Sequence, residues 1–225
     1  MLKIPFGKDK DTGRFYDAGS VLNGRKCNCT CNECGNDLEA VHPKLFGRQK
    51  YFRHVSKDHC TGGLESLFHV VAKQILKSND TLVLSENNSF VYDKCDVETP
   101  RHGKRPDAFI ANEDYGLIVE VFFSHRINPA TLEIYLANNE NILEIDISCQ
   151  RKQLFNYSYL EELILNKAPR TFSRPRKEKV ETANSEEVSG WGWLGIGLAI
   201  AAGFFLMSQK KSSNRNFWEN KQRNW

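Results

Sequence analysis

The chain has 225 residues, of which 26% are charged, and a formal net charge of +3. This length allows one ordinary domain with small additions, or two small domains. The net charge is too small to indicate nucleic-acid binding by itself, although Lys and Arg gather around the motifs below and again beyond residue 166. No apolar segment with a cleavage site opens the sequence, so we expect residues 1–189 to be cytosolic, with reduced thiols.

Cysteines are concentrated near the start of the chain. Four of the seven lie within eight residues, at Cys27, Cys29, Cys31 and Cys34. In a reducing compartment, cysteines this close together are more typical of metal ligands than of disulfides. Free thiols in a mobile loop are the alternative interpretation. A zinc ion would replace the hydrophobic core that so short a segment cannot build, so we expect residues 1–62 to contain a zinc-binding module.

The spacing within this module favours one ligand set. Cys31-x-x-Cys34 has the separation of a zinc knuckle, in which a turn points two thiolates at one ion. A second pair lies near a predicted hairpin over 38–41 and 49–54: His54 is its last residue, and Cys60 follows it. We predict a tetrahedral structural Zn²⁺ site whose ligands are Cys31, Cys34, His54 and Cys60. Cys27 and Cys29 stay open as substitutes, with His42 and His59 as less favoured alternatives.

Residues 63–168 show the pattern of a mixed α/β core. Apolar residues from Leu64 to Leu76 have the spacing of an amphipathic helix, and the later apolar runs have the length of strands. Pro129 suits the first turn of a second helix. The predicted order is a helix over 64–76, strands at 81–84 and 90–92, strands at Asp107 and Glu120, a helix over 129–138, a strand over 142–147 and a helix over 159–165.

The stretch from Lys104 to His125 is the most informative part of this core. Pro106-Asp107 begins one apolar run and Glu120 lies near the end of the next, with a turn-like segment at 112–116 between them. If the two strands pair as a hairpin, both carboxylates converge. Two convergent carboxylates form a minimal oxygen-ligand site for Mg²⁺ or Mn²⁺, as a metal-dependent phosphodiesterase requires.

Three polar residues share one face of the helix that precedes this hairpin. Glu65, His69 and Lys73 are spaced at i, i+4 and i+8, opposite the apolar face. Taken alone, they form a solvated stripe with helical charge pairing. Beside Asp107 and Glu120, they suggest a third carboxylate for the metal site and a lysine that reaches a phosphate.

Together these motifs resemble a known family. The resemblance covers about residues 25–150 of this chain and depends on the combination of motifs rather than on any one of them. The matching segments are Cys-x-Cys-x-Cys-x2-Cys at 27–34, Tyr51-Phe52-Arg53-His54, Cys60, Glu65-Ser66-x2-His69-x3-Lys73, Arg105-Pro106-Asp107, Ile118-Val119-Glu120-Val121, Ser124-His125 and the strand at 142–148. The chain is similar to the competence protein CoiA-like proteins, a branch of the PD-(D/E)XK nuclease superfamily.

The resemblance implies a restriction-endonuclease-like core, which is a central mixed sheet flanked by helices, behind an N-terminal zinc module that helps to hold DNA. It implies that Asp107 and Glu120 bind Mg²⁺ or Mn²⁺, with Glu65 as a helper. The ion would activate a water and stabilise charge on the phosphate as the phosphodiester bond breaks.

The sequence departs from the superfamily pattern at Phe122. A lysine, or a glutamine in CoiA proteins, is expected two residues after Glu120, and a phenyl ring can neither orient a water nor stabilise an oxyanion. Three replacements are open: Lys104 from the strand end, Lys73 from the helix, or His125 as a proton carrier. A degenerate, inactive site is the fourth possibility.

The C-terminal part of the chain has a different composition. Residues 169–189 form a charged linker that we expect to be largely irregular. Residues 190–208 form a hydrophobic span that starts near Trp191 and Trp193. Its stretch from Gly190 to Met207 would make a helix of about 27 Å, close to a membrane span. A buried core helix is the alternative. Small residues at Gly195, Ala199 and Gly203 would allow self-association.

The basic tail, residues 209–225, completes the chain. Basic residues are nearly balanced on the two sides of the span, so the expected reduced, metal-bound domain decides the orientation. We expect a single-pass membrane protein whose N-terminal domain lies in the cytoplasm.

Three functions are compatible with this organisation. The leading hypothesis is a membrane-anchored metal-dependent nuclease that hydrolyses phosphodiester bonds of DNA. The second is a catalytically inactive, zinc-containing nucleic-acid-binding adaptor at the membrane. The third is a membrane assembly protein whose α/β domain contacts only protein partners.

Overall fold

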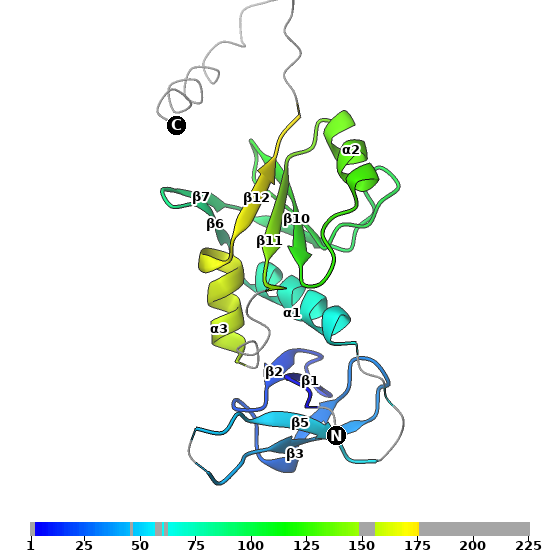
Figure 1. Cartoon of the computed structure of the whole chain (residues 1–225), viewed down its shortest axis with the longest axis vertical. Coiled ribbons are helices and arrows are strands. Elements are labelled where there is room, and N and C mark those ends of the chain that lie inside the picture. The colour runs from blue at the N-terminus through cyan, green and yellow to red at the C-terminus, as the bar shows by residue number, and fades with distance from the viewer. Residues whose placement is uncertain (1–2, 46, 57–59, 61–62, 149–155, 176–225) are drawn as a thin grey trace, which may run out of the picture. The chain divides into compact units, whose positions relative to one another are not determined.

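The computed structural model describes residues 3–45, 47–56, 60, 63–148 and 156–175. These residues belong to one compact unit, Met1–Glu178 (Figure 1). The predicted membrane span at 190–208, the basic tail at 209–225 and most of the charged linker lie outside the described residues. Within the described ranges, the structure contains no helix with the length and apolar character needed to cross a membrane.

The N-terminal module is a five-stranded antiparallel sheet of order β2-β1-β3-β4-β5. Ile4, just before β1, forms an isolated antiparallel bridge with Phe52 of the edge strand β5. Phe6, Leu38 and Phe52 fill the interior. The strands are β1 Phe6–Asp9, β2 Phe15–Asp17, β3 Gly24–Thr30, β4 Asp37–Val41 and β5 Tyr51–His54.

Helix α1 (Leu64–Ser78) connects this module to the rest of the unit. Its buried face is the apolar stripe that the sequence predicts, Leu67 to Leu76 at helical spacing. Phe68 packs edge-to-face on Phe6 of β1 at 6.0 Å and lies 4.7 Å from the ring of Phe123 in the core. Gln74 adds hydrogen bonds to the backbone N–H and carbonyl of Phe15. One helix therefore packs against both parts.

The core is a second five-stranded sheet, of order β12-β11-β10-β9-β8. The pair β10–β11 is parallel and the other pairs are antiparallel, so the sheet is mixed. The strands are β8 Lys94–Val97, β9 Ala108–Ala111, β10 Gly116–Phe122, β11 Ile142–Asp146 and β12 Arg170–Ser173. Two further strands, β6 (Thr81–Ser85) and β7 (Asn88–Val91), form a separate hairpin sheet. The predicted mixed α/β fold is confirmed.

Helices cover both faces of the core sheet. Alternate residues of β10 divide between them: Ile118 packs with Tyr135 of α2 (Pro129–Ala137), while Val119 joins the main core with the apolar face of α1. Figure 1 shows α2 beside β10 and β11. The predicted final helix forms as α3 (Tyr157–Glu162), followed by one wider turn, η2 (Leu163–Lys167). Leu160 and Ile164 bury their side chains in the main core.

Two edge strands of the core sheet, β8 and β12, were not predicted from the sequence. In β8, Lys94 and Asp96 separate Cys95 and Val97, and so short an alternation carries a weak signal. Strand β12 lies where the charged linker was expected to begin. That expectation is wrong for Arg170–Ser173, which pair antiparallel with β11, while Phe172 packs on the core. Their strand conformation follows from the free edge of β11 rather than from local composition.

Asp17 gives a test of how the module is held to the core. Its buried carboxylate accepts hydrogen bonds from the backbone N–H groups of Gly19 at 2.7 Å and Tyr157 of α3 at 2.8 Å. We expect Asp17→Ala to lower the free energy of unfolding by about 2 kcal/mol, because buried donors lose a charged acceptor. Asp93→Ala, at an exposed aspartate, is the control. Equal urea midpoints for the two variants would contradict the expectation.

Candidate metal centre and acidic cavity

The four cysteine and histidine ligands predicted from spacing lie together. The ligand atoms of Cys31, Cys34, His54 and Cys60 are all within 4.8 Å of one another, close enough to bind a metal ion such as zinc. Cys34 Sγ lies 3.3 Å from His54 Nε2, and Cys31 Sγ lies 3.9 Å from Cys60 Sγ. Three thiols and one imidazole are a ligand set that Zn²⁺ takes in structural sites.

A tight turn between β3 and β4 positions the first two ligands. The Gly35 N–H donates to the Cys31 carbonyl at 3.0 Å, and Gly35 has a φ of +71°, which favours glycine. Burial raises the pKa of Cys31 to about 11, although backbone N–H groups of Cys34 and Glu33 donate to its sulfur and act in the opposite direction. These N–H groups would stabilise the thiolate that a metal ion requires.

The structure places the alternative ligands elsewhere. The Cys27 thiol donates to the Leu38 carbonyl, and the Cys29 thiol to the Cys27 carbonyl, within the buried strands of the module. Burial raises the pKa of Cys29 to about 12, which disfavours the thiolate. His42 Nε2 is bonded to the Ala18 carbonyl. His59 lies outside the described residues.

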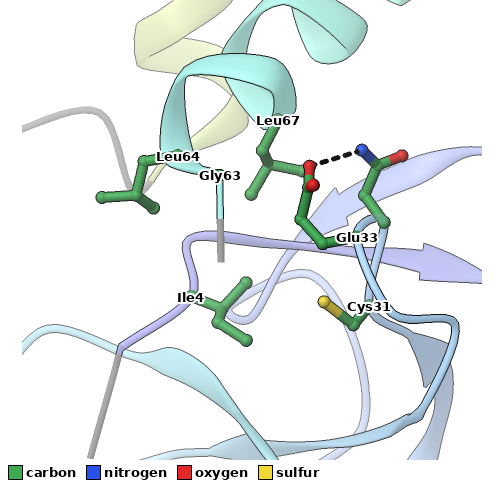
Figure 2. Close-up of a pocket in the computed structure, with 7 residues that line it drawn as sticks. Ile4, Cys31, Glu33, Gly63, Leu64 and Leu67 are labelled. Atoms are coloured by element: carbon green, nitrogen blue, oxygen red, sulfur yellow. Dashed lines mark hydrogen bonds between the residues drawn. The ribbon is translucent and has the colours of Figure 1, made fainter. Parts of the chain in front are cut away.

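The knuckle also contacts the start of α1. Figure 2 shows Glu33 of the knuckle beside Gly63, Leu64 and Leu67 at the first turn of the helix. Ser66 Oγ donates to the Glu33 carboxylate, and Asn32 Nδ2 donates to it at 3.3 Å. Gly63 gives α1 no side-chain cap, so a carboxylate here compensates the positive end of the helix. The Cys31–Cys34 knuckle therefore contacts the start of the helix that carries Glu65, His69 and Lys73.

The predicted carboxylate hairpin forms at the other end of this face of α1. Asp107 immediately precedes β9 and is 7% exposed, and β9 pairs antiparallel with β10, which carries Glu120. The Asp107 carboxylate accepts from the Val121 N–H at 2.9 Å and from His69 Nδ1 at 2.8 Å. Lys73 Nζ lies 3.3 Å from its other oxygen. Helix and hairpin thus meet at Asp107.

The charges at Asp107 are mutually stabilised. Burial alone would raise the pKa of Asp107, but the His69 hydrogen bond and charge, with Lys73, hold it below its ordinary value. Burial likewise disfavours charged His69, yet the hydrogen bond and charge of Asp107 raise the pKa of the imidazole. Lys73 is held on its other side by Glu98 at 2.7 Å. Asp107 is therefore held ionised by His69 and Lys73 of the same helix.

Glu120 has the opposite electrostatic character. Burial and the neighbouring Asp107 charge raise its pKa to about 7, while the Asp107 backbone N–H, which donates to it, reduces the shift. Within the described residues, no side chain donates a hydrogen bond to this carboxylate. A buried carboxylate with so little compensation favours a bound proton or a bound cation.

A cavity of about 180 Å³ opens beside Glu120. Glu120 and Glu144 are register partners on the parallel strands β10 and β11, so their side chains leave the same face of the sheet. Glu144 is 6% exposed and accepts from Ile127 N–H at 2.9 Å and from Arg126 Nη1 at 2.5 Å. The cavity is lined by these two glutamates with His69, Phe122, Arg126 and Thr131, among others.

The structure separates the residues that were candidates for the missing lysine at Phe122. Lys73 reaches Asp107. His125 instead pairs with Glu65 at 3.3 Å and is 85% exposed at the cavity rim. Lys104 is tied by its backbone into a turn with Arg101, and among the described residues it has no side-chain bond to either carboxylate. Lys104 is thus not brought into the site, and Glu65 pairs with His125 rather than with Asp107.

Three residues of this site were not predicted from the sequence to belong to it. His69 shared the predicted helix face but was given no role, although it bonds Asp107 directly. Glu144 carried a usable signal, because a charged residue inside the apolar run Ile142–Ile147 is costly unless paired. Arg126 lies in a loop and had no local signal.

Asp107 and Glu120 could together offer carboxylate oxygens to a divalent cation, since Mg²⁺ and Mn²⁺ prefer oxygen ligands. The charges of His69 and Lys73 offset only part of the rise in the pKa of Glu120. Comparison of the chain with family models, with curated proteins and with solved structures gave no match.

Zinc content tests the cysteine cluster. We expect the purified protein to hold one zinc ion per chain and Cys34→Ser to lose it, with a lower midpoint of thermal unfolding, because three ligands bind Zn²⁺ far more weakly than four. Cys95→Ser, at a half-buried cysteine outside the cluster, is the matched control. Mass spectrometry of the metal content is the measurement. Zinc retained at full stoichiometry by Cys34→Ser would exclude this ligand set.

Glu120 makes stability depend on pH. Its pKa of about 7 in the folded protein exceeds its ordinary value of 4.5. Folding therefore favours the protonated form, whose contribution is present below pH 4.5 and lost as the pH rises through 7. The shift corresponds to about 3 kcal/mol.

In zinc-loaded protein without added Mg²⁺ or Mn²⁺, we expect stability to fall between about pH 5 and pH 8, and to fall less in Glu120→Gln, which stays neutral. Urea unfolding across this range measures it, with Glu113→Gln in the exposed hairpin turn as the control. Parallel pH profiles for Glu120→Gln and the wild type would show that Glu120 is not the titrating group.

Proposed function

We propose that this chain is a membrane-anchored, metal-dependent nuclease that hydrolyses phosphodiester bonds of DNA, with a CoiA-like, restriction-endonuclease-like core. The observation that carries the proposal is the meeting of Asp107 and Glu120 at paired strand ends, beside a cavity. Their different protonation behaviour supports it: Asp107 is held ionised, while burial and the Asp107 charge raise the pKa of Glu120, so its ionised form would gain from a bound cation. The mixed sheet with helices on both faces is consistent with this core.

Asp107 and Glu120 would hold Mg²⁺ or Mn²⁺. When bound, the ion would supply an activated water and would stabilise negative charge on the phosphate. Asp107 is kept in position by the Val121 N–H and by His69. Lys73, between Asp107 and Glu98, keeps the cluster near electrical neutrality before any ion enters. His125 at the rim pairs with Glu65.

The zinc module and the hydrophobic segment complete the proposal. The Cys31–Cys34 knuckle holds the first turn of α1, so a structural Zn²⁺ would support the acidic site through the helix. Residues 190–208 would anchor the protein, with the N-terminal domain in the cytoplasm, and their small residues would allow self-association. DNA near the membrane would then be the substrate.

Phe122 favours a second candidate function. Because the position lacks a lysine, the same fold would also suit a catalytically inactive, zinc-containing nucleic-acid-binding adaptor. Such an adaptor would bind nucleic acid in a salt-dependent manner. Its binding would be indifferent to Asp107→Ala.

Cleavage assays separate the two functions. With Mg²⁺ or Mn²⁺, we expect the wild type to cut single- or double-stranded DNA, and Asp107→Ala or Glu120→Ala to reduce the rate by about 100-fold or more, because the ion loses a ligand. Glu113→Ala, in the exposed turn of the same hairpin, should cut normally. Folded wild-type protein that cuts nothing with any divalent ion would rule out the nuclease. Unchanged, salt-dependent DNA binding by Asp107→Ala would then support the adaptor.

A further inference from the structure

Arg126 lies directly over the residue that breaks the superfamily pattern. Its guanidinium carbon is 4.7 Å from the centre of the Phe122 ring, a cation–π distance. Phe122 follows Glu120 by two positions on β10, so both side chains leave the same face of the sheet. The ring thus holds a guanidinium beside Glu120, and all three residues line the cavity.

Two carboxylates fix the orientation of this guanidinium. Arg126 Nη1 lies 2.5 Å from Glu144 Oε1, and Nη2 lies 3.5 Å from Asp146 Oδ2. A guanidinium has five N–H donors. Because the described residues give Arg126 these two ion pairs, donors remain for a ligand. The Arg126 side chain is 58% exposed, which leaves it accessible from solvent. It is restrained without being enclosed.

The first turn of α2 adds to the positive side of the cavity. Asn128, the N-cap of this nine-residue helix, and Thr131, in its first turn, both line the cavity. A helix N-terminus carries partial positive charge and favours anions. The Thr131 hydroxyl is a further donor. The positive groups at this side therefore come from the β10–α2 loop and from the helix itself.

The cavity consequently has two sides of opposite character. Glu120, with Asp107 behind it, attracts a cation, whereas Arg126 and the start of α2 attract an anion. A volume of about 180 Å³ exceeds the share of a single water several-fold. A phosphate group paired with a divalent cation matches both sides at once, and Arg binds phosphate oxygens with a planar fork of donors.

We propose that Arg126, supported by the ring of Phe122, is the phosphate-binding residue of this cavity and contacts the phosphodiester that the chain acts on. The proposal rests on the proposed nuclease function for the identity of the ligand. Phe122 then supports the guanidinium, in the place where a lysine would otherwise act. A simple structural ion pair between Arg126 and Glu144 is the competing account.

Binding of a single-stranded phosphorothioate oligodeoxynucleotide to the full chain, measured by fluorescence anisotropy with Mn²⁺ present, tests the proposal. We expect Arg126→Ala to weaken binding at least about tenfold, because a charge-assisted bond to phosphate is lost. Arg174→Ala is the matched control, because Arg174 is also an exposed arginine over a phenylalanine ring, at 4.6 Å from Phe172 on β12. It should change binding less than twofold.

A rescue experiment separates phosphate binding from a structural ion pair. Phe122→Lys, added to Arg126→Ala, returns a cation to the same face and should recover most of the lost affinity. A purely structural Arg126 would not be replaced in this way, and thermal unfolding of each variant checks that the fold is kept. Equal binding by Arg126→Ala and the wild type, a wild type that does not bind, or an unrescued loss shared by Arg174→Ala would each overturn the proposal.

The outcome is distinguishable from that of the nuclease proposal. If the wild type binds through Arg126 but cuts no DNA, the phosphate site stands and the hydrolytic function fails. If the wild type cuts DNA and Arg126→Ala cuts with unchanged KM and kcat, the nuclease stands and Arg126 is not its phosphate ligand.

Discussion

A buried carboxylate must be compensated by donors and positive charge, and Asp107 draws both from elements distant in sequence. The Val121 N–H comes from the paired strand, and His69 and Lys73 come from α1. These bonds fix the register of the hairpin against the helix. Glu120, on the next strand, then lies near Asp107 without equivalent partners, which explains why its pKa rises to about 7 while that of Asp107 falls.

Helix α1 connects the Cys/His cluster to this carboxylate. Its first turn meets Glu33 of the knuckle, its apolar face packs on both sheets, and its polar face supplies His69 and Lys73. A helix is stiff over its length, so a shift at the first turn displaces the side chains farther along. The cysteine cluster and the acidic cavity are thus mechanically linked, although they share no ligand. This favours a zinc module that serves the core through packing.

Local patterns in the sequence predicted most helices and strands of the core, but not its edge strands or all of its contacts. The turn at 112–116 and its flanking apolar runs predicted the carboxylate hairpin, and Cys-x-x-Cys spacing predicted the metal cluster. Strand β12 was not predicted, because its conformation depends on pairing with the edge of β11. Lys104 is close to Asp107 in sequence, yet Lys73 pairs with it, since helix packing determines that contact. Arg126 lies in a loop, where no periodicity indicates which way a side chain is held.

Lys73 and Arg126 each pair with two carboxylates, but they differ in exposure. Lys73 is 14% exposed and is held between Asp107 and Glu98. Arg126 is 58% exposed, lies over an aromatic ring and faces the cavity. Under the proposal that Arg126 binds phosphate, the ligand would reach the guanidinium without breaking the Asp107 cluster. Neutralising Asp107 and binding the ligand would then fall to different residues, and the Phe122 ring would support the guanidinium.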